Sequence, residues 1–428
     1  MSVPPTVDGG RRVAVVGAGI VGVSCAWQLQ RRGYQVTLID RLPPGEACSF
    51  GNAGVIATSS FLPLVMPGAW RQVPKWLLSA EGPLALSWRD LPRTLGWFRQ
   101  ANRAATREGV ASASRALHAL HAGAVEDHLA QAQEAGCASL LQRSGYLFVY
   151  PSEEAYAREQ GGWTLRRSLG MELRELDAET LKEVEPALTD SFACGVLLDG
   201  HATVLDPGGL AKALAADFER RQGRRLKAEL HAVVPRPGGG LHLMTEEGER
   251  EADTLVLAAG VWSAQLARQL GHDFPLTAER GYHIMYEKPG VRLRQPVMFA
   301  EQKFVATSME QGLRLAGTAE FAAVERPANT RRWAMMERLA RRFLKGLDSS
   351  RPSRWVGARP SLPDSLPVIG RSQLHRDVVF AFGHGHTGLT ASATTACIVA
   401  ALIAGEAPPI DIAPFSPGRF PVLRAASA

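Results

Sequence analysis

Arg12 to Gly22, which reads RVAVVGAGIVG, decides the fold predicted for this chain. Residues 13–16 are typical of a buried parallel strand, and the pattern after the glycines is that of a helix. In a strand–turn–helix unit of this kind, Gly17 makes the tight turn, Gly19 lets the backbone approach a pyrophosphate, and Gly22 lets the helix pack on the strand. The free N–H groups at the helix N-terminus bind phosphates. The segment therefore predicts a dinucleotide site.

A second apolar strand supports this interpretation. Residues 35–39 end in Asp40, about twenty residues after the glycine turn, where a carboxylate accepts hydrogen bonds from both ribose hydroxyls. Arg41, the next residue, can add a contact. The glycine motif alone is weak evidence, but here the strand, the helix and the terminal acid are all correctly spaced. We therefore expect a Rossmann-like unit that holds the ADP part of a cofactor.

The composition is that of a globular enzyme with two domains, because 428 residues are too many for one simple core. The net charge is +6, but arginines are interspersed with glutamates, as in residues 331–342, so we expect solvated helix faces and no nucleic-acid partner. The five cysteines are far apart and form no C-x-x-C pair. This spacing argues against a metal site or a disulfide framework and favours a reducing compartment, such as the cytoplasm.

Neither end of the chain suggests a membrane anchor. Residues 1–10 form a polar tail rich in Pro and Gly, which we expect to be disordered. The glycine motif explains the apolar run after Arg12 better than a signal peptide does. Leu389–Ala404 is too short to span a bilayer and contains hydroxyl side chains, so we expect a buried helix there and no transmembrane segment.

Two later segments are predicted to join the same parallel sheet. ADTLVLAAG (252–260) ends in small residues, and DVVFAF (377–382) leads into the loop GHGHTGLT (383–390) and the apolar helix. A helix that starts near Gly388 directs free N–H groups at whatever lies above the loop. This positive end favours the negative charge that a flavin gains at N1 and O2 on reduction. The sequence therefore favours FAD over NAD.

The remaining segments predict an inserted α+β domain that covers the cofactor. Residues 102–135 and 153–169 are helical in pattern, 145–151 predict a strand, and 281–287, 303–308 and 313–320 alternate as antiparallel strands do, with a hairpin turn at 311–312. The predicted fold class is thus α/β, with a discontinuous parallel-sheet FAD domain and an α+β substrate domain carrying an antiparallel sheet. The expected boundaries are 11–58, 190–275 and 352–420 for the FAD-binding domain, and 59–189 and 276–351 for the substrate-binding cap.

Together these motifs resemble the glycine oxidase/D-amino-acid oxidase superfamily of flavoproteins, and within it the bacterial D-amino-acid dehydrogenases. The resemblance extends from Arg12 to Phe420. It rests on VAVVGAGIVG, TLIDR, SFGNAGVI (49–56), a tryptophan-rich insertion (59–100), VEPAL (184–188), ERGYHI (279–284), GARPSLPDSLPVIG (357–370) and GHGHTGLT.

The resemblance implies an extended FAD along the first domain. FAD should be non-covalent, because Gly357 stands where some relatives carry a flavin-linked cysteine. The implied cofactor contacts are Gly17, Ala18, Gly19, Ile20, Gly22, Asp40 and Arg41 at the ADP part, Asn52, Ala53, Gly54 and Val55 under the isoalloxazine, Val233 and Gly260 between them, and Gly385, Gly388, Leu389 and Thr390 at the pyrimidine edge.

The same resemblance places a substrate-binding arginine at Arg359, in G-A-R-P where the family has G-L-R-P. A planar guanidinium binds a carboxylate with two hydrogen bonds. Tyr282 is predicted as a second substrate contact, with a core tyrosine as the alternative. His384 could approach flavin or substrate, or have no active role. Arg314 is expected where sarcosine oxidases use a lysine that helps oxygen react, which favours a dehydrogenase.

The implied reaction is oxidation of a D-amino acid by hydride transfer from Cα to flavin N5. The imino acid is then hydrolysed to a 2-oxo acid and ammonia, and the electrons pass to a quinone or another acceptor. Three alternatives stay open. They are a D-hydroxyproline or D-proline dehydrogenase, a glycine/sarcosine-type oxidase that makes hydrogen peroxide, and a non-catalytic FAD-binding subunit of a complex.

The insertion that follows the first domain is unusually rich in tryptophan. Residues 61–97 contain four of the nine tryptophans. One interpretation is a segment that packs over the pocket. The other is a membrane-interface patch on the inner face of the bacterial membrane, since tryptophan is favoured at that interface and a quinone would be reached there.

Overall fold

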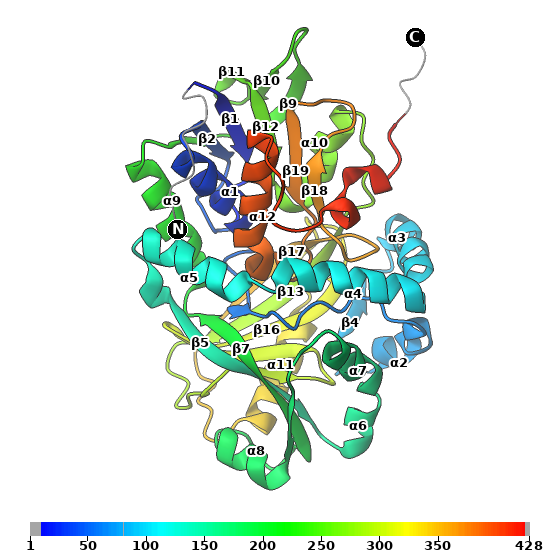
Figure 1. Cartoon of the computed structure of the whole chain (residues 1–428). Helices are drawn as coiled ribbons and strands as arrows, with labels where there is room; N and C mark the ends of the chain where they lie inside the picture. The colour runs from blue at the N-terminus through cyan, green and yellow to red at the C-terminus, as the bar shows by residue number, and fades with distance from the viewer. Residues whose placement is uncertain (1–9, 80, 424–428) are drawn as a thin grey trace.

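The six-stranded sheet has the parallel order that the glycine motif predicts (Figure 1). The computed structural model describes residues 10–79 and 81–423. In the six-stranded sheet, neighbouring strands run parallel, except that β18 and β19 are antiparallel. In the order of the sheet, the strands are β18 (Val368–Arg371), β19 (Val378–Phe382), β12 (Thr254–Leu257), β1 (Arg12–Val16), β2 (Gln35–Asp40) and β8 (Arg224–Lys227).

Both faces of this sheet are covered, which explains the continuous apolar composition of β1. Helices α1 (Ile20–Arg31), α9 (Pro207–Arg220) and α12 (Gly388–Ala404) pack on one face. The other face packs against α10 (Ser263–Gln269) and a three-stranded sheet. That small sheet contains β9 (Leu230–Pro235), β10 (Leu241–Thr245) and β11 (Gly248–Ala252).

The second, ten-stranded sheet lies below the first in Figure 1 and is mostly antiparallel. Its buried core packs against α11 (Thr330–Phe343). Along the sheet the strands are β17 (Pro352–Ser361), β13 (Thr277–Tyr286), β16 (Gly312–Phe321), β15 (Phe304–Met309), β14 (Val297–Phe299), β5 (Leu141–Tyr150), β7 (Cys194–Val204) and β3 (Val55–Ile56), with β4 (Leu84–Leu86) beside β16 and β6 (Arg174–Asp177) beside β7.

In Figure 1 the other labelled helices cross the middle of the view (α4 and α5) or lie at its right and lower end. The α-helices are α2 (Val73–Leu78), α3 (Leu91–Ala104), α4 (Arg107–His121), α5 (Ala124–Glu134), α6 (Glu153–Ala157), α7 (Gln160–Ser168) and α8 (Ala178–Val184). The 3-10 helices are η1 (Ala69–Arg71), η2 (Ala138–Leu140), η3 (Gly260–Trp262), η4 (Ala413–Phe415) and η5 (Pro417–Arg419).

The predicted fold class is confirmed, but the division into domains differs from the expected one. β3, β7 and β17 were assigned to the FAD-binding part and instead belong to the ten-stranded sheet. β17 pairs with β13 over ten residue pairs, a partnership that its own composition does not reveal. Conversely, α5 was assigned to the cap and packs in the core of the parallel sheet. Of the tail predicted for residues 1–10, only residue 10 falls within the described part of the chain.

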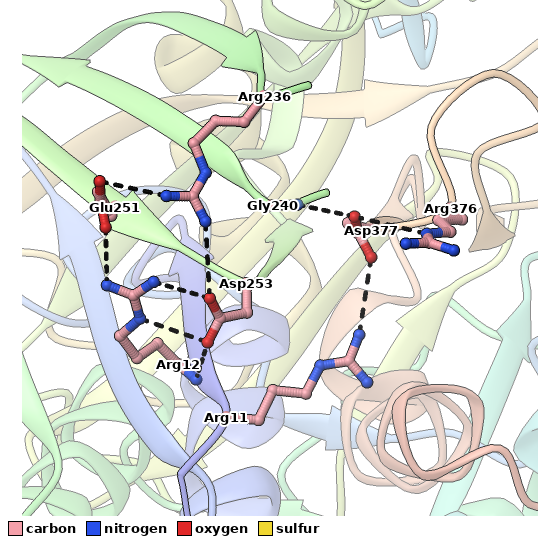
Figure 2. Close-up of polar contacts among 8 residues, drawn as sticks. All are labelled: Arg11, Arg12, Arg236, Gly240, Glu251, Asp253, Arg376 and Asp377. Carbon is pink, nitrogen blue, oxygen red and sulfur yellow. Dashed lines mark hydrogen bonds and ion pairs between the residues drawn. The ribbon is translucent and has the colours of Figure 1, made fainter. Parts of the chain in front are cut away.

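A charged cluster fixes the amino-terminal end of β1 (Figure 2). Arg12 pairs with Asp253 at 2.8 Å and with Glu251 at 3.0 Å, and Arg11 lies 3.7 Å from Asp377. The Arg12 guanidinium holds the pKa of the Asp253 carboxyl below its ordinary value. The cluster thereby links β1 to the segments that lead into β12 and β19. The cluster lies at the amino-terminal ends of these strands. Their carboxyl ends, on the other side of the sheet, are free to form a site.

Candidate active site

A cavity of about 1530 Å³ lies between the two sheets. Its floor is formed at the carboxyl ends of β1, β2, β12 and β19, where ligands of open α/β sheets bind. Its roof comes from β13, β16 and β17 of the ten-stranded sheet. The volume exceeds the roughly 300–1,000 Å³ of a pocket for one drug-sized ligand. A dinucleotide and a small substrate fit in it together.

The first strand–helix turn has the geometry of a phosphate site. Gly17 has φ +109, and a Cβ there would lie 2.3 Å from the carbonyl oxygen of Ala258. A Cβ on Gly22 would lie 1.8 Å from the carbonyl oxygen of Gly17, so this glycine allows close helix–strand packing, as predicted. Gly19 is the N-cap of α1 and offers no side chain to the free N–H groups. The Ile20 N–H donates to Ser49 Oγ at 2.8 Å, and the other free N–H groups of the turn are available to an anion.

Asp40 is held in place by the backbone of the same turn. Its Oδ2 accepts a hydrogen bond from the Ala18 N–H at 2.6 Å, and its Oδ1 accepts one from the Leu42 N–H at 2.8 Å. Asp40 lines the cavity, as does Arg41, whose guanidinium lies 4.8 Å from the ring centre of Trp262. Both residues stand where the sequence predicts the ribose and adenine end of the cofactor.

The amino-terminal end of α12 closes the other end of the cavity. Gly388, Leu389 and Thr390 form its first turn, all three line the cavity, and no side chain caps the helix. Gly385, with φ +54, shapes the loop before it. An uncapped helix end that faces a cavity suits the pyrimidine edge of a flavin. The residues at both ends of the cavity therefore fit FAD.

The loop that leads to β3 is held from below by a buried arginine. Arg314 Nη1 donates hydrogen bonds to the carbonyl oxygens of Phe50 and Asn52, both at 2.8 Å. Burial lowers the pKa of Arg314 to about 10. Arg314 does not line the cavity, so the expectation that it faces the flavin is wrong, and it gives no argument for a dehydrogenase. Lys303 does line the cavity and is paired with Glu159.

Arg359 lies in the roof of the cavity, flat over the backbone of Gly281. A Cβ on Gly281 would lie 2.3 Å from Arg359 Nη2, so only glycine leaves room for this guanidinium. Nη1 donates to Glu279 Oε1 at 2.8 Å and to the Thr318 carbonyl oxygen at 3.1 Å. Within residues 10–79 and 81–423, Nε and Nη2 have no hydrogen-bond acceptor in the protein. This edge of the guanidinium can bind a carboxylate.

Tyr282 is not in the cavity, which corrects the predicted substrate contact. Its side chain is 1 % exposed, its hydroxyl donates to Glu320 and accepts from the Asn329 N–H, and its ring packs on Trp333 of α11. Gly281 lies on the cavity side of β13, and Tyr282 points to the other side. Both faces of the strand are buried from Glu279 to Tyr286, so the sequence does not reveal which face borders the cavity.

The glycine loop after β19 brings two histidines to the cavity. His384 lines it, and its Nε2 lies 3.1 Å from Thr395 Oγ1. Burial lowers the pKa of His384 to about 3, so its ring is neutral at physiological pH. His386 also lines the cavity, and burial lowers its pKa as well. A role for His384 in catalysis stays a prediction.

Most predicted cofactor residues meet in this one cavity, but Val233 does not. Val233 is buried in the small sheet, and Leu230 and His231, earlier on β9, line the cavity instead. Ala18, Gly22 and Gly54 also lie outside the lining and act through their backbones. The predicted residues in the lining are Gly17, Gly19, Ile20, Asp40, Arg41, Asn52, Ala53, Val55, Gly260, Arg359, His384, Gly385, Gly388, Leu389 and Thr390.

Sequence reasoning missed the two buried charged residues of the lining. Glu279 is 2 % exposed and pairs with Arg359. Arg166 of α7 is also buried, its guanidinium lies 4.6 Å from the ring centre of Trp163, and burial lowers its pKa. A glutamate within an apolar strand is the signal that could have revealed Glu279. Arg166 lies next to the exposed Arg167 of α7 and gives no such signal.

Residues 10–79 and 81–423 contain no group of three His, Cys, Asp or Glu side chains that could hold a metal ion. Over the same residues, no helix combines the length and the apolar character needed to cross a membrane.

Comparison with known proteins agrees with this geometry. The DAO family, described as FAD dependent oxidoreductase, matches residues 12–402. A D-amino-acid oxidase of Bradyrhizobium diazoefficiens is 38 % identical over 418 residues, which cover 96 % of this chain and 99 % of the relative. A D-amino acid dehydrogenase of Dechloromonas aromatica is 31 % identical, with 96 % and 100 % covered.

Among solved structures, glycine oxidase from Geobacillus kaustophilus has the same fold. It superimposes with a TM-score of 0.74 at 20 % identity, over 95 % of this chain and 98 % of the other. The family match and the cavity agree that the cofactor of this chain is FAD. The chain belongs to the DAO family of FAD-dependent oxidoreductases.

Proposed function

We propose that this chain oxidises D-amino acids to 2-oxo acids and ammonia. Support comes from relatives over the full length, 38 % and 31 % identical, which are named D-amino-acid oxidase and D-amino acid dehydrogenase. The observation that carries the proposal is Arg359, a guanidinium in the cavity roof with one edge free for a carboxylate. It lies in the same cavity as the uncapped end of α12.

In the proposed reaction the chain binds and orients the substrate. Bound FAD supplies a ring nitrogen that takes up a hydride. Arg359 binds the substrate carboxylate and fixes Cα in one orientation. The entropy of orienting the substrate is thereby lost on binding and does not add to the barrier of the reaction. The first turn of α12 stabilises negative charge at the reduced ring. The neutral ring of His384 adds no positive charge beside the substrate amine. The amine loses its proton before the transfer, and the imino acid is hydrolysed afterwards.

A substrate screen tests the proposal and separates its alternatives. D-amino acids, glycine, sarcosine, D-proline and cis-4-hydroxy-D-proline are assayed with a dye acceptor, with and without oxygen. We expect turnover with neutral D-amino acids and with dye, and little peroxide. A preference for the cyclic amines would indicate a secondary-amine dehydrogenase, and oxygen-dependent peroxide an oxidase. If no amine reacts, the non-catalytic subunit becomes the better account.

For the electron acceptor we propose a quinone reached at a membrane surface formed by residues 64–107. Seven of the fourteen exposed large apolar side chains of the described chain lie here, including Trp70, Leu78 and Trp88. On this side of the molecule α2 and α3 lie together (Figure 1). Exposed tryptophan, leucine and basic side chains are typical of surfaces that bind the lipid interface. The basic residues are Arg71, Lys75, Arg89, Arg93, Arg99, Arg103 and Arg107, none of which pairs with an acid in the described chain.

Sedimentation with vesicles tests this surface. We expect the protein to bind vesicles that contain about one third anionic phospholipid and to be released by salt, because basic side chains supply part of the attraction. The double variant Leu78→Ser/Trp88→Ser should bind several-fold more weakly and oxidise substrate with dye as before, because neither side chain lines the cavity. A matched control is Leu374→Ser, which alters an exposed leucine outside both this surface and the cavity. If the unaltered protein, the double variant and the control bind vesicles equally, or if the unaltered protein does not bind them, the proposed membrane surface is rejected.

A further inference from the structure

Glu279 is a carboxylate in the roof of the substrate cavity. Its side chain lines the cavity and is 2 % exposed. It stands on β13 directly opposite Arg359 on β17. Arg359 Nη1 donates to its Oε1 at 2.8 Å, and Ser361 Oγ donates to its Oε2 at 2.7 Å. Two neighbouring strands thus hold the carboxylate and its partner guanidinium side by side.

The pair leaves binding capacity on both partners. A carboxylate has about four lone-pair positions, and each oxygen of Glu279 receives one hydrogen bond from the protein. The guanidinium has five N–H donors, and those of its Nε and Nη2 edge have no acceptor in the described chain. The cavity roof therefore offers a donor edge and an acceptor side by side.

We propose that Glu279 binds the amino group of the substrate while Arg359 binds its carboxylate. This inference rests on the proposed oxidation of amino acids and names the feature by which they are selected. The site takes a zwitterion, and it rejects carboxylates that lack an amine, such as 2-hydroxy acids. Neither the family match nor the names of the relatives assigns a role to this glutamate.

The charges around the site explain the selectivity. Arg359 and Glu279 cancel, and the nearby ring of His384 is neutral. An acid without an amine brings a second negative charge next to Glu279, which is unfavourable in a buried site. A zwitterion brings one charge to each partner. A lone arginine would bind any small carboxylate, so the glutamate supplies the element that disfavours the wrong ligand.

Two ligands of equal shape test this idea without turnover. 2-Aminoisobutyrate has no Cα hydrogen and cannot be oxidised, and trimethylacetate replaces its ammonium group by a methyl group. Binding of each to the FAD-loaded enzyme is measured from the change in flavin absorbance or from competitive inhibition. We expect the unaltered enzyme to prefer 2-aminoisobutyrate by about tenfold or more, the usual size of a charged hydrogen bond.

In Glu279→Gln we expect this preference to fall by about tenfold or more, with weaker binding of 2-aminoisobutyrate and equal or tighter binding of trimethylacetate. A structural role alone would weaken both ligands together, through a displaced Arg359. An unchanged ratio, or an equal loss for both ligands, would overturn the proposal. The control is Glu320→Gln, which removes another buried carboxylate of the same sheet that pairs with Arg280 at 3.4 Å outside the cavity.

If Glu279→Gln does not retain FAD, Glu279→Asp replaces it, because aspartate keeps the charge and shortens its reach by one methylene. We then expect the preference for 2-aminoisobutyrate to survive in reduced form. Complete loss or full retention of this preference would contradict the proposal.

Failure of this inference can be told apart from failure of the proposed function. If D-amino acids reduce the flavin and the ligand ratio does not respond to Glu279, only this inference fails.

Discussion

Arg359 makes contacts of two kinds, one with the protein and one that is open to a ligand. Its Nη1 is held by Glu279 and the Thr318 carbonyl oxygen, and its other edge faces the cavity. For Arg359→Ala we expect a loss of about 3 kcal/mol in transition-state binding, which is about a hundredfold in kcat/KM, because a charged contact is removed. A change of less than threefold would reject the role.

The control for this variant is Arg354→Ala. Arg354 lies on the same strand, is half exposed and pairs with Glu337 outside the cavity at 2.7 Å. Its removal should leave kcat/KM unchanged, because exposed ion pairs contribute little to stability or to positioning.

Gly281 controls the position of Arg359 without any charge of its own. In Gly281→Ala the new methyl group would lie 2.3 Å from Nη2, so the guanidinium must move. The atom in conflict is the end of a flexible side chain, and we therefore expect the fold and FAD to be retained. KM for the D-amino acid should rise by about tenfold or more, since a small misplacement of a binding group is costly. Unchanged kinetics with an unchanged melting temperature would contradict the account.

At this scale the sequence predicts residues whose role depends on local spacing. Gly17, Gly19 and Asp40 belong to one short motif, and the structure places all three at the cavity. Tyr282 and Val233 were misplaced, because strand pairing and packing decide which face of each strand borders the cavity, and the sequence does not state them. Glu279 was missed for a related reason. Its partner Arg359 is eighty positions away and meets it only through strand pairing.

The strand–helix unit of β1 and α1 depends on a close contact at Gly22. A Cβ at this position would lie 1.8 Å from the carbonyl oxygen of Gly17, which is backbone and cannot move aside cheaply. For Gly22→Ala we expect a loss of about 2 kcal/mol or more in the free energy of unfolding and release of FAD on gel filtration. Gly33→Ala is the control, since nothing lies within 4 Å of its added methyl group, although its φ of +88 adds some strain. If both variants behave alike, packing at the turn is not the cause.

Helices and strands with a clear local sequence pattern were predicted well, but the sheet that each strand joins was not. The apolar runs and glycine turns around β1, β2, β19 and α12 give their type and direction. β17 and β7 are also regular strands, but nothing in their composition states which of two sheets they join. Helix α5 gives a similar case, because its buried alanines pack in the core of the parallel sheet although the chain around it belongs to the cap.

Across the whole molecule, buried histidines make stability depend on pH. Burial lowers the pKa of His121 and His283 to about 3 and that of His201 to about 4, whereas the unfolded chain takes up protons below about 6.5. The histidines therefore do not reduce the free energy of unfolding above pH 6.5. Below pH 6.5 it falls as the pH is lowered, by up to about 1.4 kcal/mol per pH unit for each histidine. Melting temperatures between pH 7.5 and 5 should show this decline.

His121 provides the direct check, because neither ring nitrogen has a hydrogen-bond partner in the described chain. His121→Leu should flatten the decline and raise the melting temperature at pH 5.5, with little change at pH 7.5. A steeper decline, or none in the unaltered protein, would show that these rings are protonated in the folded state.

The central claim is that one cavity holds FAD against a substrate bound by Arg359, and anaerobic titration tests it most directly. The purified yellow protein is mixed without oxygen with D-alanine, L-alanine or cis-4-hydroxy-D-proline, and the flavin absorbance near 450 nm is followed. We predict bleaching by a D-substrate, little or none by L-alanine, and a rate at least about a hundredfold lower in Arg359→Ala. A colourless protein that cannot be reconstituted with FAD, or flavin that no amine bleaches, would contradict the account.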